Sequence, residues 1–401
     1  MNKNHFFRVF IITILIFCFI ADISVYSKIN NVYAYYFMAF IIVLAMLKYI
    51  INKCIVRDTN KAKVIWFQFK YNFISKIVIY LYSLTLLFFG LTEKRFLSSN
   101  IQTFINGLSS ISVFYLLGVN AFDYSVTAML YAYIIEISVG LIRKGINISL
   151  EFHDLAFSVG YVILYMLYTG KYRTKKGFII LTVMVLVAVG AGKRIGLLAI
   201  IFTIFLWKII DKAKDNRKRR MMFWGGCIIV AVNLLFLQFS MNTDIRKIAA
   251  RFPIGMSGRE YYYEALQPYV RNEITFLGLG RNAVQVIMTE DFPWFHVGNV
   301  HSDIFRMYAE CGFILFFLWL LWYLVIMVRS AIRKFGLPVG EFVFLLTVYT
   351  FIVYFTDNTE LYLMNQYFYI LAMLIFSYEA KSRGVQWKMR VQNGVEEKQI
   401  Q

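Results

Sequence analysis

Long apolar runs recur from one end of this chain to the other, and they constrain its fold more than any other feature. A helix of about 20 apolar residues spans the ~30 Å hydrocarbon core of a bilayer. The chain is 60% hydrophobic with a mean hydropathy of +0.61, whereas soluble chains are nearer half apolar. Because lipid leaves no partner for open backbone groups, these runs predict an all-α polytopic integral membrane protein.

The apolar runs predict about twelve transmembrane helices. Their approximate positions are 6–21, 33–51, 65–90, 101–117, 124–142, 155–169, 177–191, 195–210, 221–239, 304–328, 339–356 and 363–378. The first run has a basic start, as a signal peptide does, but a second run follows closely. We therefore expect an uncleaved first helix.

The charged residues orient these helices. Only 16% of the residues are charged, yet the net charge is +19, which in a membrane protein indicates positively charged cytoplasmic loops rather than nucleic-acid binding. The segments "KYRTKK" (171–176), "KIIDKAKDNRKRR" (208–220) and "RSAIRK" (329–334) and the tail after 380 carry this signature. With twelve spans, both termini are then cytoplasmic.

Four regions follow from this topology. They are an N-terminal bundle of about nine helices (1–239), a large extracytoplasmic loop with short helices (240–303), C-terminal transmembrane helices (304–380) and a basic cytoplasmic tail (381–401). The four cysteines all lie outside the large loop, so we expect no disulfide.

The large loop holds a group of cations that, apart from one lysine, are all arginine. They are Arg246, Lys247, Arg251, Arg259, Arg271, Arg281 and, just beyond the loop, Arg306. The planar guanidinium fits phosphate oxygens, which favours an anion site. The alternative is loop charge paired with the acidic residues of the same segment.

Local patterns in the loop suggest order. Ser257 and Glu260 form a capping-box pattern that places Arg259 in the first turn of a helix, where an anion is favoured, and Pro268 is expected to limit that helix. The turn "GLG" before Arg281 leads into another helix; such a turn can hold phosphate but is also an ordinary loop feature.

Two histidines precede the apolar run that begins near 304. His301 comes directly before "SD", a plausible N-cap, and so lies at the membrane surface, where a group titrating near pH 6.5 can act as a general base. The alternative is an interfacial histidine without a task. His296 lies five residues earlier, a spacing that does not indicate zinc. We expect no metal and no cofactor.

A short outer hairpin carries Lys193 and Arg194 side by side. Adjacent cations at the bilayer surface are costly unless they are used or solvated. Simple snorkelling to water is the alternative.

Five segments resemble one family in their order along the chain. They are "GAGKRIGLLA", "SGRE", "FLGLGRNAV", "HSDIFRMYAECGFILFF" and "YFTDNTEL". Over roughly residues 180–365 the chain is similar to the O-antigen ligase/polymerase superfamily, Wzy-type repeat-unit polymerases in particular. Ser302 stands where the family often has asparagine, and Lys193 where a small polar residue is common.

The resemblance implies a fold like that of the C-type glycosyltransferases (GT-C-like) and a metal-independent reaction. The donor it implies is a glycan on undecaprenyl pyrophosphate, with Arg194 and Arg259 on the pyrophosphate and His301 as the base. To these we add Arg281 as a phosphate contact, Glu310 as a local orienting residue, and Lys193 and His296 as further substrate contacts. His296 is also a second candidate for the base.

The expected function is therefore polymerisation of lipid-linked repeat units into O-antigen, capsular or exopolysaccharide chains at the outer face of the bacterial cytoplasmic membrane. Partners would be the lipid-linked donor, membrane lipid, and flippase and chain-length regulator proteins, with no nucleic acid. A ligase of the same superfamily and a flippase for lipid-linked oligosaccharide are the alternatives. Concentration of cations in one long loop favours an enzyme over a flippase.

Overall fold

The computed structural model describes residues 3–51, 59–96, 101–145, 152–241, 246–247, 258–271, 276–295 and 299–383. Its α-helices are α1 (Lys3–Asp22), α2 (Val32–Ile51), α3 (Thr59–Gln68), α4 (Ser75–Phe88), α5 (Ile101–Leu117), α6 (Ala121–Lys144), α7 (His153–Thr169), α8 (Lys175–Gly190), α9 (Arg194–Asp211), α10 (Asp215–Ser240), α12 (Arg259–Arg271), α13 (Ala283–Glu290), α14 (Asp303–Leu321), α15 (Val328–Phe335), α16 (Leu337–Tyr354) and α17 (Leu363–Arg383). These described residues form no β-strand, so the predicted all-α class is confirmed.

Each predicted apolar run coincides with a helix of the structure. Two runs are compound helices, in which a π-helical segment joins two α-helices: Phe69–Ile74 joins α3 to α4, and Trp322–Met327 joins α14 to α15. Seven helical stretches of the described residues are long and apolar enough to cross a membrane, and one of them contains both α5 and α6. The structure therefore supports a multi-pass membrane protein, and the count of twelve stays a prediction.

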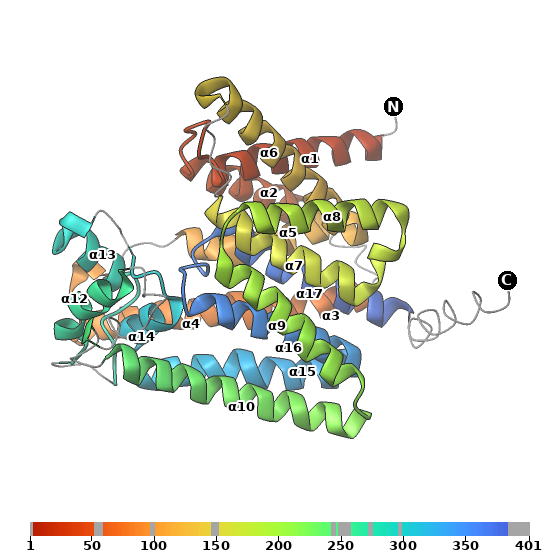
Figure 1. The fold of residues 1–401 in the computed structure, drawn as a ribbon. Helices are drawn as coiled ribbons and strands as arrows, with labels where there is room; N and C mark the ends of the chain where they lie inside the picture. Colours follow the sequence, from red (N-terminus) through yellow and green to blue (C-terminus); the bar gives the residue numbers. More distant parts are fainter. Residues whose placement is uncertain are drawn as a thin grey trace.

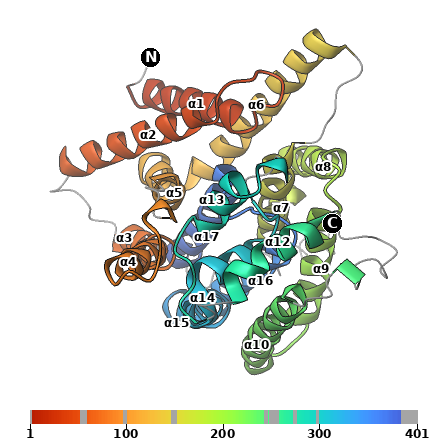
Figure 2. The ribbon, with the colours of Figure 1, turned by 90° about the vertical axis from the view of Figure 1, so that its left-hand side faces the viewer.

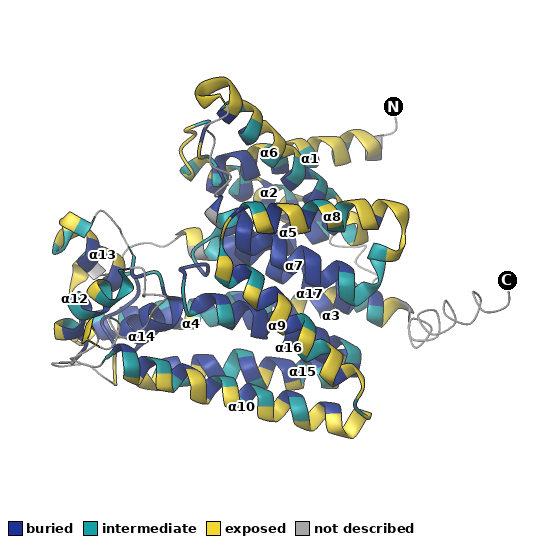
Figure 3. Ribbon diagram, viewed as in Figure 1, coloured by how far each residue is buried: buried dark blue, intermediate teal, exposed yellow. Residues whose placement is uncertain are grey.

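Helices α16 and α17 form the centre of the bundle. Nearly every residue of α16 is buried, and α17 is buried from Leu363 to Ser377. Figure 3 shows this buried pair surrounded by helices such as α8 and α10, whose outward faces are exposed. Exposed apolar side chains on those outer helices, among them Phe178, Phe205 and Trp224, are what lipid-facing surfaces carry.

One end of the bundle, which we call the loop end, holds α12, α13 and residues 355–362 (Figure 1). The end of α1 meets the start of α17 there, because the backbone N–H of Met364 donates to the Asp22 carboxylate at 3.1 Å. The side chain of Asn106, near the start of α5, donates to the carbonyl of Leu361. Figure 2 looks onto this end, with α12 and α13 in front of α14, α16 and α17.

The opposite end, which we call the basic end, carries the connections from α7 to α8, α9 to α10 and α15 to α16. These connections and the helix ends beside them hold Lys171, Arg173, Lys175, Lys176, Lys212, Lys214, Arg217, Arg219, Arg220, Arg329, Arg333 and Lys334. Helix α1 begins and α17 ends at this end (Figure 1).

The predicted loop helices are present, with one boundary wrong. Helix α12 begins at Arg259, as expected, but it continues through Pro268 to Arg271. Pro268 cannot donate to the carbonyl of Glu264 four residues earlier, and the helix continues past it despite that loss. Ser257 and its predicted capping role lie outside the described residues. Cys18, Cys227 and Cys311 are free thiols, and Cys54 is not among the described residues.

Candidate functional site

The start of α14 is bound to the loop between α16 and α17. Ser302 is extended and caps the helix, its hydroxyl accepting from the N–H of Phe305 at 3.3 Å, which confirms the predicted N-cap. The N–H of Ser302 donates to the Asn358 side chain at 3.2 Å. The N–H of Asp303 donates to the carbonyl of Asp357 at 3.1 Å. Residues 301–303 and 357–358 are therefore held as one unit.

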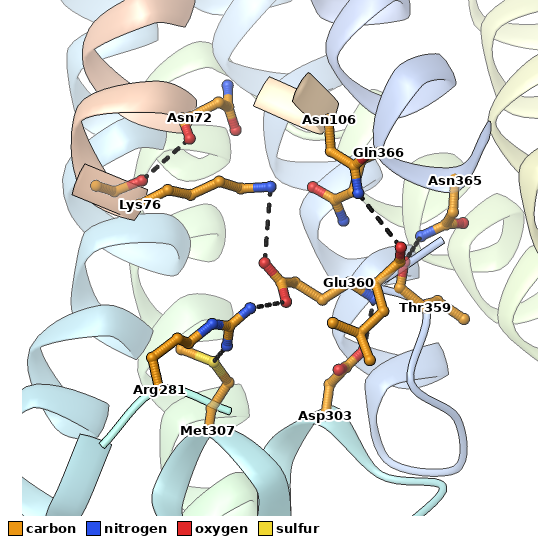
Figure 4. Close-up of polar contacts among 12 residues, drawn as sticks. Asn72, Lys76, Asn106, Arg281, Asp303, Met307, Thr359, Glu360, Asn365 and Gln366 are labelled. Atoms are coloured by element: carbon orange, nitrogen blue, oxygen red, sulfur yellow. Dashed lines mark hydrogen bonds and ion pairs between the residues drawn. The ribbon is translucent and has the colours of Figure 1, made fainter. Parts of the chain in front are cut away.

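A buried cluster of charged side chains, which we call the charge cluster, lies next to residues 301–303 and 357–358. It contains three cations and three carboxylates. Its members are Lys76, Arg281, Asp303, Arg306, Glu310 and Glu360, each at most 8% exposed. Arg281 lies 3.0 Å from Glu310 and 2.8 Å from Glu360. Arg306 lies 2.6 Å from both Asp303 and Glu360. Figure 4 shows Lys76 and Arg281 both pointing toward the Glu360 carboxylate.

Glu360 is the centre of this cluster. Its carboxylate contacts Arg281, Arg306 and Lys76, the last at 3.6 Å, and its backbone N–H donates to Asp303 at 2.7 Å. Burial raises the pKa of Glu360, but the charges of Arg281, Arg306 and Lys76 outweigh it and hold that pKa below its usual value. Buried charges persist only where each has partners, and in this cluster the partners link four separate segments of chain.

A small cavity of about 20 Å³, room for a single water, borders Lys76 and Glu360. Its wall includes Ser75, Tyr323 and Gln366. The two π-helical segments meet beside it, where the rings of Tyr71 and Trp322 lie 4.9 Å apart and the hydroxyls of Ser75 and Tyr323 lie 3.0 Å apart. π-helical turns occur frequently at functional sites.

The glycine turn before Arg281 docks into a break in α14. Gly312 has φ +68° and ψ 173° inside that helix, which frees the carbonyls of Ala309 and Glu310 from their helical partners. The N–H groups of Leu279 and Gly280 donate to those two carbonyls, both at 2.9 Å.

The contact is backbone against backbone. A Cβ built on Gly278 would lie 2.3 Å from the Gly312 nitrogen, and one on Gly312 would lie 2.4 Å from the Gly278 nitrogen. The next N–H, of Arg281, donates to the hydroxyl of Ser83 at 2.9 Å. With these donors already bonded within the protein, the structural interpretation of "GLG" is favoured over a phosphate cradle.

His301 lies outside the charge cluster and is partly exposed to the surface. Its side chain is 36% exposed, and its Nδ1 lies 3.7 Å from Oδ1 of Asp357, which is 4% exposed. The residue has φ +50°, a conformation that is uncommon outside glycine and gathers at functional sites.

The surroundings of Asp357 favour its ionised form beside this histidine. Its Oδ1 accepts hydrogen bonds from the Tyr362 hydroxyl at 2.7 Å and from the N–H of Asn358 at 2.8 Å. Burial raises the pKa of Asp357. Contact with His301 and these two hydrogen bonds lower it by a larger amount, so the pKa lies below its usual value. A negative charge behind Nδ1 leaves Nε2 as the nitrogen that can take a proton.

Helix α12 brings Arg259 to the same loop. The Arg259 guanidinium donates to the carbonyl of Thr356 at 2.9 Å, one residue from Asp357. The ring of Tyr263 stacks on Phe305 at 4.8 Å, which holds α12 against the start of α14. The ring of Tyr262 lies 6.0 Å from that of His301. Arg259 and His301 therefore converge on residues 356–357.

The hairpin cations both lie at the start of α9. Lys193 is half-buried and interacts electrostatically with Asp154 at the start of α7, which in turn interacts with Asp22 and Asp357. Arg194 is exposed as the first residue of α9, and no described residue forms a hydrogen bond or ion pair with it. The structure thus links Lys193 to the neighbourhood of Asp357 and leaves Arg194 open to the surface.

The remaining predicted residues are buried, paired with acidic residues, or outside the described part of the chain. Arg281 and Glu310 form an ion pair inside the charge cluster, and Arg281 is only 4% exposed. Arg246 pairs with Glu264 of α12, as the alternative of paired loop charge requires. His296 lies outside the described residues.

Sequence reasoning missed the partners of these residues. Asp357 and Glu360 stand in "YFTDNTEL", a segment matched as a whole without a role for either carboxylate. Lys76 was visible as one of few charges inside an apolar run, which is itself a signal of function. In the part of the chain that the structure describes, no three His, Cys, Asp or Glu side chains lie together as a metal site would require.

No protein-family model matches the chain, and no curated protein matches it.

Proposed function

We propose that the protein is a membrane polysaccharide polymerase that joins undecaprenyl-pyrophosphate-linked oligosaccharide repeat units at the outer face of the bacterial cytoplasmic membrane. The observation that carries the proposal is the convergence of Arg259 and His301 on residues 356–357 at the ends of apolar helices. It gives a half-exposed base backed by a buried carboxylate, with an arginine beside it. Glycosyl transfer from a lipid pyrophosphate needs those groups at a membrane surface.

In the proposed reaction, a hydroxyl of the acceptor glycan attacks the anomeric carbon of the donor. Nε2 of His301 takes the hydroxyl proton as the new carbon–oxygen bond forms. The bond from the anomeric carbon to the phosphate oxygen breaks, and the lipid pyrophosphate leaves with its electron pair. Asp357 stabilises the imidazolium that results, and this requires no metal in the step.

The arginines would bind the leaving group. Cations from separate elements can neutralise the charge that develops on pyrophosphate, which is the largest electrostatic demand of the step. Arg259 is bound to the carbonyl of Thr356, one residue from the Asp357 that His301 faces. Arg194 and Lys193 lie in the hairpin that we expect to contact the lipid-linked end of the donor. The burial of Arg281 favours a role in positioning the loop over direct contact with phosphate.

The lipid tail of the donor explains the site's place in the fold. Because the tail stays in the bilayer, the reacting carbon can only reach groups near the membrane surface, and His301 directly precedes α14. With the basic end in the cytoplasm, the loop end faces outward. A twelve-span, GT-C-like topology with both termini inside belongs to the same proposal, as do flippase and chain-length regulator proteins as partners.

The test is substitution in the native host. His301→Gln and Arg259→Gln are each compared with His5→Gln and Lys94→Gln, exposed residues with matched changes, at equal membrane levels. Glycan length is read on gels, and the lipid-linked pool by mass spectrometry. The proposal expects loss of long chains and accumulation of single repeat units on the outer face.

Other outcomes assign other functions. Long polymer that stays on the lipid carrier would identify a ligase. Single units retained on the inner face would identify a flippase. Unchanged glycan in both variants would remove His301 and Arg259 from the site.

A further inference from the structure

A charged hollow lies at the basic end, the opposite end of the bundle from the candidate site. Between α10 and the stretch from Leu324 to Arg333 is a cavity of about 440 Å³. Its cations are Arg219, Arg220, Arg329 and Arg333. The rest of its wall is apolar, including Phe223 and Val325, and no acidic residue lines it.

The shape of this cavity follows from two glycines. Gly226 brings α10 so close to the π-helical segment that a Cβ there would lie 2.7 Å from the carbonyl oxygen of Leu324. A Cβ on Gly225 would lie 2.9 Å from the ring of Phe344. One turn earlier, α10 carries Met222 and Phe223 in place of glycine, and the helices are far enough apart to leave the hollow.

The four arginines of this hollow are exposed and have no described carboxylate beside them, unlike the buried arginines of the charge cluster. No described residue forms an ion pair or hydrogen bond with any of them, whereas Arg281 and Arg306 at the loop end are enclosed by carboxylates. Four like charges around one hollow repel each other, so an anion bound there gains from all of them.

Exposed aromatic and apolar side chains border the hollow. Beside it on α10, Trp224 is 61% exposed, as aromatic side chains are at the bilayer interface. Ile326 and Phe223 carry an exposed apolar surface on the bilayer side. The cavity thus joins a group of cations to exposed apolar surface, the combination that a phospholipid headgroup and its acyl chains require.

We infer that this pocket binds an anionic phospholipid of the membrane leaflet at the basic end. The arginine forks contact the phosphate, and the acyl chains lie along Phe223 and Val325. Guanidinium groups pair with phosphate oxygens in a bidentate manner, and basic pockets between transmembrane helices bind lipid headgroups. A free phosphate ion satisfies the arginines but leaves the apolar wall to water, which disfavours it.

The test uses delipidated protein in detergent and measures lipid binding by native mass spectrometry and thermal unfolding. Phosphatidylglycerol is compared with phosphatidylcholine and with inorganic phosphate. Arg219→Gln/Arg333→Gln removes two of the four charges, and Lys212→Gln/Arg217→Gln removes two charges nearby that do not line the pocket. Val325→Trp fills the pocket without changing charge.

The inference expects phosphatidylglycerol to bind and to raise the unfolding temperature, with the pocket double variant about 30-fold weaker, from the usual gain per basic residue. Val325→Trp is expected to weaken binding as well, and Lys212→Gln/Arg217→Gln to leave it unchanged. Equal stabilisation by inorganic phosphate or by phosphatidylcholine overturns the inference. So does equal loss in the two double variants, which would indicate diffuse surface charge.

Discussion

Two groups of charged residues share the loop between α16 and α17, and they differ in how their charges are partnered. In the buried charge cluster around Glu360, each carboxylate lies within 3.5 Å of an arginine, and the members are at most 8% exposed. Three residues away, Asp357 faces His301, whose side chain is 36% exposed. The first group has little left to offer a ligand, and the second has an open nitrogen.

The difference teaches that the number of charges does not identify a site. The charge cluster is the larger group, but its arginines donate to carboxylates of the protein. These ion pairs connect α4, α14, the turn before α13 and the loop between α16 and α17, and we call this connection the joint. We expect it to position residues 356–358, on which His301 and Arg259 converge. The following variants separate the joint from the site.

The largest effect is expected from Glu360→Gln. Removing one partner of a buried ion pair leaves cations uncompensated and costs about 3–5 kcal/mol. We expect a strongly lowered unfolding temperature and loss of folded protein in size-exclusion chromatography. Glu93→Gln, on an exposed carboxylate at the same end, is the control. A stable Glu360→Gln protein would mean that the cluster is not the joint.

His301→Gln should reduce activity without reducing stability, the reverse of Glu360→Gln. Glutamine keeps a polar side chain but cannot take a proton, and a lost general base costs about 100-fold or more in rate. We expect polymer formation to fall by that factor while the unfolding temperature stays within about 1 °C of the parent. Parallel loss of activity and stability would place His301 in the joint.

Gly312→Ala tests whether the joint depends on the break in α14. A Cβ at φ +68° is strained and would meet the backbone of Gly278, so we expect about 2–3 kcal/mol of destabilisation. Protection of the Leu279 and Gly280 amides in hydrogen exchange should fall with it. Gly90→Ala, at another positive φ with open space around it, controls for backbone strain alone.

Acid should affect the two groups in the same direction. The pKa values of Asp357 and Glu360 are both lowered on folding, so each contributes stability that is present above its unfolded pKa and is lost as the pH falls. We expect a nearly constant contribution above about pH 5 and a declining unfolding temperature below about pH 4. Asp357→Asn should reduce the steepness of that decline, and an unaltered slope would contradict the assignment.

The smallest effect is expected at the helix cap. Ser302→Ala removes the acceptor for the N–H of Phe305 and should cost about 1 kcal/mol. Calorimetric or fluorescence-detected unfolding measures it. Ser302→Asn, which restores a capping side chain, should recover most of the loss, and equal destabilisation by both would mean that the cap contributes nothing.

The positions of the long helices could be predicted from the sequence because a bilayer requires apolar runs, and each run at 6–21 through 363–378 is a helix. Local rules also predicted that Arg259 lies in the first turn of α12 and that α14 is capped at Ser302. The end of α12 was missed because a proline disfavours a helix locally, whereas residues beyond it, such as the buried Val270, pack in the helical conformation.

The pairings could not be predicted in the same way. Glu360 binds Arg281 across 79 positions of sequence, and several other carboxylates were equally available to that arginine. The segment "AECGF" is apolar enough to be one helix, so nothing local announces that Gly312 breaks it to receive the turn at Gly278. Which carboxylate meets which arginine is decided by how distant helices pack.

The two π-helical segments have a consequence for how this fold tolerates change in length. A π turn holds one residue more than the α turn that it replaces. Phe69–Ile74 and Trp322–Met327 are therefore equivalent to single-residue insertions, and the two segments face each other. Deleting one residue from the first would restore a regular helix and turn everything after it by about 100°. Lys76 would then leave Glu360 and face another side of the helix. The register of that one lysine therefore depends on a single codon, and a lineage that lost it would lose the ion pair without any substitution.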